Sequence, residues 1–370
     1  MTFLPGLDMD LECCLLLECF AGDPAQADDP ALPPARLRAH YARRFRLSDA
    51  RADALFGPLE AAYDAVTARL PFAPESLRAD FSLPGANASP ACAILLTERF
   101  LARVPDATEA ERRALIARRL LGALLPDPET ADAGWGDPEA AFVRALSGTG
   151  LSDAAKWAAC DLFFCYDARR DAVMDVLAQT RPLLEQAVPL LEPLMRLFRE
   201  ETDEAVARAG GAQAFLTRYG VSLDAADCPI QPLAFAPTRI CAQSDATCAR
   251  AAGLPERQQL LWGLLFCPLA REEERLDPAE ALMPALKALA DPRRMQILSM
   301  LARGPLYGQE IVRRMGLTPA TISHHMAELM HGGLLDARKE GVRYRYDLRR
   351  DRIDALADAL RELLGGAGGT

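Results

Sequence analysis

The feature that most constrains this 370-residue chain is a short break between two amphipathic patterns near its C-terminal end. Residues 307–315 (YGQEIVRRM) place apolar residues at helical spacing, and Gly316 tolerates the positive φ at which helices end. Thr318 is a good N-cap, and Pro319 suits the first position of the next helix because no N–H is needed there. The sequence therefore predicts two helices joined by a tight turn.

The second helix of this pair has one apolar and one polar face. Ile322, Met326 and Leu329 are spaced as a core-facing stripe. The opposite face is small, polar and nearly uncharged, which suits close approach to bases and phosphates in a major groove. Adjacent histidines point about 100° apart and do not readily share a metal, so we assign His324 to DNA and His325 to packing or a backbone contact. The residues predicted at double-stranded DNA are Thr318, Ala320, Thr321, Ser323, His324 and His325.

After Gly333 the spacing of apolar residues changes from helical to alternating. Val342, Tyr344, Tyr346 and Leu348 alternate with mainly basic residues, which is typical of a strand with one apolar face. Residues 339–342 fit a hairpin turn. We therefore predict a two-stranded wing that meets phosphates or the minor groove. Its predicted DNA-binding residues are Arg338, Lys339, Arg343 and Arg345.

Charge is distributed unequally along the chain. The whole chain has 42 Lys and Arg against 52 Asp and Glu, a net charge of -10. Residues 279–370 contain 14 basic and 11 acidic residues, which leaves 28 basic and 41 acidic residues in the first 278. The C-terminal region can therefore attract phosphate, whereas the acidic remainder cannot.

The first 270 residues carry patterns of their own. Helical spacing interrupted by proline predicts mainly helices, including a long one over 182–209 that kinks or breaks at Pro189 and Pro193. Residues 221–268 contain alternating and short apolar runs, which predict a small antiparallel sheet, although a short apolar run can also be a buried helix. The predicted fold class is mainly α, and α+β overall. The predicted parts are a helical N-terminal domain (1–270), a charged linker (271–282), a winged helix-turn-helix (283–364) and a flexible tail (365–370).

The ten cysteines show no zinc-type C-x2-C spacing, and we expect free thiols and no metal. Cys160 and Cys165 lie in an apolar helix, where packing in the core is favoured. Cys241 and Cys248 flank a polar loop and are the candidate pair for a redox or thiol sensor. The first 20 residues lack a basic segment before their apolar run, and no stretch approaches about 20 uncharged apolar residues. We therefore expect a soluble, cytoplasmic protein with no membrane partner.

The segments LADPRRMQIL, GLTPATISHHMAEL, GGLL and YRYDL together closely resemble the ArsR/SmtB family of bacterial winged-helix repressors. The resemblance covers about a quarter of the chain. It implies a homodimer that binds a palindromic operator and represses until an inducer arrives. It also implies that the first and last helices of the domain form the dimer interface.

This chain departs from the family at both common metal sites. The Cys-x-Cys pair of the metal-sensing members is replaced by Gln309-Glu310-Ile311. The last helix has Asp351, Asp354 and Asp358 but no histidine. We therefore expect no metal and no cofactor, and the inducer must be sought elsewhere.

The sequence thus predicts a DNA-binding transcription regulator of ArsR type whose N-terminal domain senses a small molecule or a redox signal. The alternative is that this domain serves only for dimerisation or protein interaction, with no small-molecule ligand. An enzyme is not expected, because the chain has no Gly-rich phosphate loop, no G-x-S-x-G and no H-E-x-x-H. His40 is the one histidine outside the C-terminal region.

Overall fold

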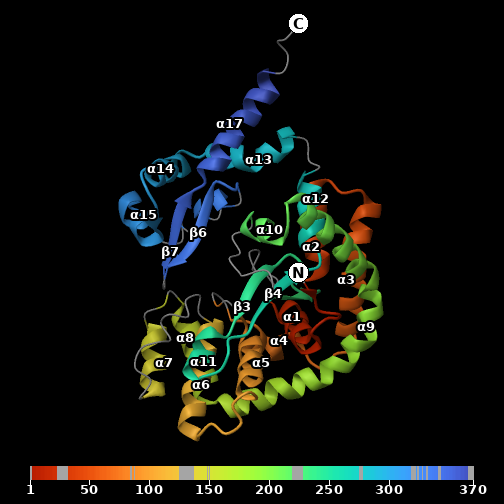
Figure 1. The fold of residues 1–370 in the computed structure, drawn as a ribbon, viewed down its shortest axis with the longest axis vertical. Helices are drawn as coiled ribbons and strands as arrows, with labels where there is room; N and C mark the ends of the chain where they lie inside the picture. Colours follow the sequence, from red (N-terminus) through yellow and green to blue (C-terminus); the bar gives the residue numbers. More distant parts are fainter. Residues whose placement is uncertain are drawn as a thin grey trace. The chain divides into compact units, whose positions relative to one another are not determined.

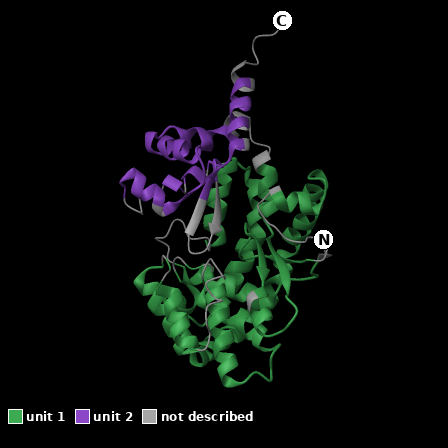
Figure 2. Cartoon of the chain, turned by 60° about the vertical axis from the view of Figure 1, so that its left-hand side comes forward, with its two compact units in different colours: residues 1–272 green, residues 273–370 purple. Residues whose placement is uncertain are grey.

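The computed structural model divides the chain into two compact units, unit 1 (Met1–Glu272) and unit 2 (Glu273–Thr370) (Figure 2). No helix among the described residues has both the length and the hydropathy needed to cross a membrane. The described residues are 2–22, 32–83, 86, 88–124, 137–147, 149, 151–218, 228–274, 278–317, 322, 325–326, 328–330, 332–340 and 343–365.

Unit 1 is mainly helical, as predicted. Its first helices are α1 (Met9–Ala21), α2 (Pro34–Phe45), α3 (Asp49–Thr67), α4 (Pro74–Phe81), α5 (Pro90–Leu101) and α6 (Glu109–Leu124). The others are α7 (Pro138–Ser147), α8 (Asp153–Phe164), α9 (Tyr166–Arg208), α10 (Ala212–Arg218), α11 (Ala246–Ala251) and α12 (Phe266–Glu274).

Helix α9 continues without a break through Pro189 and Pro193, where the sequence predicted kinks or breaks. It has 43 residues and contains Pro182, Pro189 and Pro193, and Figure 1 shows it as one long curved ribbon. The three prolines are exposed, whereas Leu184, Leu191 and other residues at helical spacing are buried. Packing of this buried stripe, in part against α3 and α1, holds the helix together although each interior proline disfavours it.

The sheet of unit 1 is mixed, which corrects the antiparallel prediction. Its strands are β1 (Thr2–Phe3), β2 (Pro229–Leu233), β3 (Ile240–Ser244) and β4 (Gln258–Gly263), in the order β1-β2-β4-β3. Strand β2 is parallel to β1 and β4, and β3 is antiparallel to β4. The alternation within a strand does not specify its direction. Here β3 and α11 lie between β2 and β4 in the sequence, which lets the chain return and run parallel.

A buried carboxylate joins α1 to the chain just after β2. Glu12 is fully buried, and its carboxylate accepts the N–H groups of Ala234 at 2.7 Å and Phe235 at 3.0 Å. Burial raises the pKa of Glu12 to about 8, and the two N–H groups act in the opposite direction. The contact connects segments more than two hundred residues apart.

Unit 2 combines helices with a small antiparallel sheet of three strands. Its elements are α13 (Pro278–Leu289), α14 (Pro292–Leu301), β5 (Leu306–Tyr307), α15 (Gly308–Met315), β6 (Leu335–Glu340), β7 (Arg343–Leu348) and α17 (Arg350–Gly365). The described residues of segment 271–282, predicted as a linker, belong to α12 and α13. Its Glu and Arg residues are good helix formers, and Pro278 opens α13 at a position that proline tolerates.

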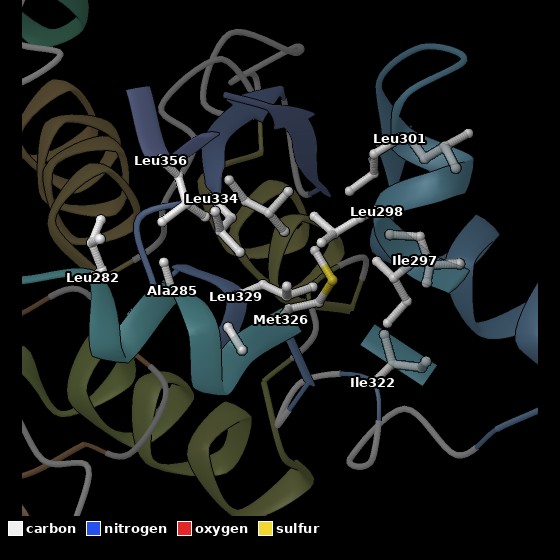
Figure 3. Packing of buried hydrophobic residues seen from close by; sticks show 14 residues of the cluster. Leu282, Ala285, Ile297, Leu298, Leu301, Ile322, Met326, Leu329, Leu334 and Leu356 are labelled. Atoms are coloured by element: carbon white, nitrogen blue, oxygen red, sulfur yellow. The ribbon is translucent and has the colours of Figure 1, made fainter. Parts of the chain in front are cut away.

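The core of unit 2 contains the predicted apolar stripe. Ile322, Met326 and Leu329 are at most 2% exposed. Figure 3 shows these side chains in one cluster with residues of α13, α14 and α17. The cluster therefore joins α13, α14, α15, α17 and the described residues after the predicted turn in one core.

Candidate nucleic-acid interface

The turn between the two predicted helices is present. Glu310 accepts the N–H of Tyr307 at 2.9 Å, which stabilises the first turn of α15. Helix α15 ends at Gly316, which has a φ of 64° and donates its N–H to the carbonyl of Val312 at 3.0 Å. A left-handed residue at this position is the usual end of a helix and suits glycine. The chain is thereby turned toward the following helical segment.

The segment after this turn is described only in part. Residues 322, 325–326 and 328–330 are helical. Five of the residues predicted to contact DNA lie outside the described residues, and their role stays a prediction. They are Thr318, Ala320, Thr321, Ser323 and His324.

His325 lies inside unit 2. Its side chain is 8% exposed. The pKa of Asp291, which caps α14, is lowered mainly by the N–H of Arg294, and His325 adds a smaller electrostatic contribution in the same direction. Of the two roles predicted for His325, packing accounts for this burial, whereas a DNA contact stays a prediction.

Arg294 positions the helical segment that contains Glu328, and the sequence did not predict this role. Its guanidinium donates to the carbonyls of Ala288 and Lys287, both at 2.9 Å, and so binds the C-terminal end of α13. It also pairs with Glu328 at 3.4 Å. In the sequence it stands in a basic pair after a proline, which looks like a solvent-exposed charge and gives no signal of this contact.

The predicted wing is a hairpin of β6 and β7. The backbone register pairs Arg338 with Arg345, Lys339 with Tyr344 and Glu340 with Arg343. Residues 339 and 340, expected in the turn, therefore belong to β6. The side chains of Arg338, Lys339, Arg343 and Arg345 lie outside the described part, so their contact with DNA stays a prediction.

The cysteines are all free thiols. Cys241 in β3 and Cys248 in α11 line the same cavity of unit 1, and burial raises the pKa of both thiols. Cys165 is exposed, which corrects its predicted place in the core, because it stands between α8 and α9 where the helical spacing is interrupted. Among the described residues, no group of three or more His, Cys, Asp or Glu could hold a metal ion.

The comparisons with known proteins concern the same C-terminal region. Residues 291–337 match the family described as bacterial regulatory protein, arsR family. The transcriptional activator HlyU of Vibrio cholerae is 34% identical over 96 residues, 26% of this chain and 88% of that protein. The arsenical resistance operon repressor of Staphylococcus xylosus is 34% identical over 75 residues, 20% of this chain and 72% of that protein. A solved structure, HlyU from Vibrio cholerae N16961, is 36% identical, covers 22% of this chain and 88% of that chain, and has a TM-score of 0.19. Through residues 291–337, the chain belongs to the arsR family of bacterial regulatory proteins.

Proposed function

We propose that this protein is a transcription regulator that binds a specific sequence of duplex DNA as a homodimer on a palindromic operator. The observation that carries the proposal is the combination of the Gly316 turn with the hairpin that follows it. The turn joins α15 to a helical segment on the same core, and the backbone register places Arg338 opposite Arg345. Such a helix reads base edges, and a basic wing binds the phosphate backbone.

The proposed roles divide between sequence reading and general affinity. Thr321 and His324 read bases in the major groove, and Arg343 and Arg345 bind phosphates. In a homodimer, two recognition helices meet half-sites about 34–36 Å apart, one helical turn of DNA. A palindromic footprint is therefore part of the proposal.

We further propose that unit 1 senses a signal and that the protein represses until the signal arrives. Unit 1 is a compact unit separate from the DNA-binding region and contains a cavity of about 590 Å³. The relatives include both a protein named an activator and one named a repressor. Repression is therefore tested by transcription from the regulated promoter with and without the protein.

The central experiment is DNase footprinting and quantitative binding on the DNA upstream of the protein's own gene. Thr321→Ala and His324→Ala should change which sequence is preferred. Arg343→Ala should weaken all sequences alike and reduce the slope of log affinity against log salt by about 1. Arg181→Ala, which removes the same charge from an exposed position of unit 1, is the matched control and should leave binding unchanged.

The absence of a protected palindrome, together with unchanged binding in all three unit 2 variants, would contradict the proposal. A uniform loss in Thr321→Ala with no change of preference would assign that residue to the backbone instead of the bases.

A second candidate function for unit 1 is protein interaction without a small-molecule ligand. Trp157 and Phe164, both on α8, are 76% and 49% exposed, and large exposed apolar side chains are common at protein contacts. Thermal shifts on addition of small molecules would favour sensing. A tight dimer that dissociates in Trp157→Ala and shows no such shifts would favour this second function.

A further inference from the structure

One cavity of unit 1 is lined by both apolar side chains and arginines. It has a volume of about 590 Å³ and lies where α1, α5, α6 and α11 meet β2, β3 and β4. Its volume is within the range of about 300–1,000 Å³ that is common for small-molecule sites. Leu11 and Leu15 of α1, Leu233 of β2 and Leu261 of β4 form the apolar wall.

Three arginines, Arg118, Arg119 and Arg239, also line the cavity. Arg119 donates from Nε to the carbonyl of Leu96 and from Nη1 to the carbonyl of Ser244, both at 3.3 Å. Both acceptors are neutral, and burial is the main cause of the lowered pKa of Arg119. An anion beside this half-buried guanidinium would add to the partial compensation that the two carbonyl oxygens and the electrostatic effect of Asp245 already give it.

The carboxylate that lines this cavity is already engaged. Asp245 forms an ion pair with Arg103 and accepts the N–H of Arg257 at 2.7 Å. It is the one acidic residue in the described lining, against three arginines. Among the described lining residues, cationic side chains therefore outnumber acidic ones.

Three cysteines also line the cavity and do not offset that charge. The pKa of Cys92 is raised first by its hydrogen bond with Cys14, and those of Cys241 and Cys248 first by burial. Protonated thiols are neutral, weak nucleophiles and behave as small polarisable apolar groups. They extend the apolar surface that an uncharged part of a ligand would contact.

We propose that this cavity binds an amphipathic organic anion, with its carboxylate or phosphate at Arg119 and its apolar body against the leucine wall. An effect of this ligand on DNA binding rests on the sensing role proposed for unit 1. Binding of the ligand to the cavity does not depend on that role. Strand β4, which supplies Leu261, is followed after two residues by α12, and unit 1 ends within that helix, at Glu272. A ligand on β4 is thus close in sequence to the connection between the units.

The first test is calorimetric titration of the full chain, without DNA, with decanoate, decyl phosphate, decanol and decylamine below their micelle concentrations. Decanoate or decyl phosphate should bind at least about tenfold more tightly than decanol or decylamine, and the tighter of the two identifies the head group. Arg119→Gln should weaken binding of the anion by roughly tenfold to a hundredfold, as expected for hydrogen bonds to a charged group. Equal affinity for decanol, or an unchanged affinity in Arg119→Gln, would overturn the proposal.

A second variant tests the cavity without touching its charge. Gly122 of α6 lines the cavity, and a Cβ added there would have nothing within 4 Å. Gly122→Leu should therefore keep the fold, since leucine favours a helix over glycine, and should obstruct the cavity. The control is Gly57→Leu in α3, where an added Cβ also has nothing within 4 Å and which lies outside the cavity lining.

Decanoate binding should fall at least tenfold in Gly122→Leu and stay unchanged in Gly57→Leu. Wild-type affinity in a folded Gly122→Leu variant would overturn the assignment to this cavity. A chain that binds the operator but no amphipathic anion contradicts this inference alone. A chain that binds decanoate but no duplex DNA contradicts the regulator function instead.

Discussion

The contacts that stabilise unit 1 and those that stabilise unit 2 span very different distances along the chain. In unit 1, Thr2 pairs with Pro229 in the sheet, and Glu12 binds the N–H of Ala234. In unit 2, two residues separate the strands of the wing, and Asp291 caps the helix that starts at the next residue. Substitutions in unit 1 therefore disturb contacts between distant segments, whereas those in unit 2 act on one small core and its local caps.

The largest effect is expected in the core of unit 2. Leu329 is fully buried, and Leu329→Ala should destabilise this unit by about 2–5 kcal/mol and remove operator binding at moderate urea concentrations. Its neighbour Met330 is 39% exposed, so Met330→Ala should change stability by less than about 0.5 kcal/mol. Urea unfolding followed by DNA binding measures both. Equal effects of the two variants would show that this segment does not pack as described.

A close backbone approach in unit 1 gives the next largest effect. An added Cβ at Gly263, at the end of β4, would overlap the carbonyl of Pro237, so Gly263→Ala should destabilise unit 1 by about 1–3 kcal/mol. Gly57→Ala, in open space on α3, should stabilise it slightly. Circular dichroism melts compare the two variants. A stable Gly263→Ala protein would contradict the approach of the 237 loop to β4.

The buried carboxylate of unit 1 predicts a dependence of stability on pH. The pKa of Glu12 is raised from 4.5 to about 8, so its stabilisation is fully present below pH 4.5 and is lost as pH rises through about 8. The two N–H donors favour the charged form, but burial outweighs them, so the net pKa stays raised. Urea unfolding of unit 1 between pH 5 and 8 should show this decline in the wild type and a flatter profile in Glu12→Gln. Parallel profiles would assign the decline to another group.

The N-cap of α14 in unit 2, Asp291, should show the opposite sign and the smallest effect. The pKa of Asp291 is lowered from 3.8, mainly by the N–H of Arg294, so its stabilisation is present above that pH and is lost as pH falls below it. Asp291→Asn keeps a good N-cap without the charge and should remove this loss while leaving stability near pH 7 almost unchanged. Unfolding of unit 2 between pH 3 and 5 measures the difference. A loss that persists in Asp291→Asn would exclude Asp291 as its source.

The same contrast explains which elements were predictable. The stripe of Ile322, Met326 and Leu329 and the turn at Gly316 follow from spacing within about fifteen residues, and both are present. The wing was placed correctly to within two residues at its turn, because alternation marks a strand more sharply than it marks the strand's end. The candidate DNA contacts were chosen from the polar face of the same pattern.

Elements that depend on distant segments were not predictable in the same way. The prolines of α9 indicated kinks or breaks, but packing of its buried stripe keeps one helix. Arg294 pairs with Glu328, which lies 34 residues further along the chain, and no local pattern indicates that contact. The requirement for glycine at position 263 comes from the close approach of the Pro237 carbonyl, which the sequence around Gly263 does not indicate.

The sequence by itself determined the winged helix-turn-helix, its basic hairpin and the division of charge, because each follows from the spacing or charge of residues that are close together along the chain. Only the tertiary structure decided the mixed strand directions and the cavity that Arg119 of α6, Cys92 of α5 and Cys241 of β3 line together. The physical reason is that helix and strand periods are local, whereas strand direction depends on how separate strands pair, as Ile230 of β2 does with Leu260 of β4. The cavity lining in turn arises when segments more than a hundred residues apart, such as α6 and β3, pack together.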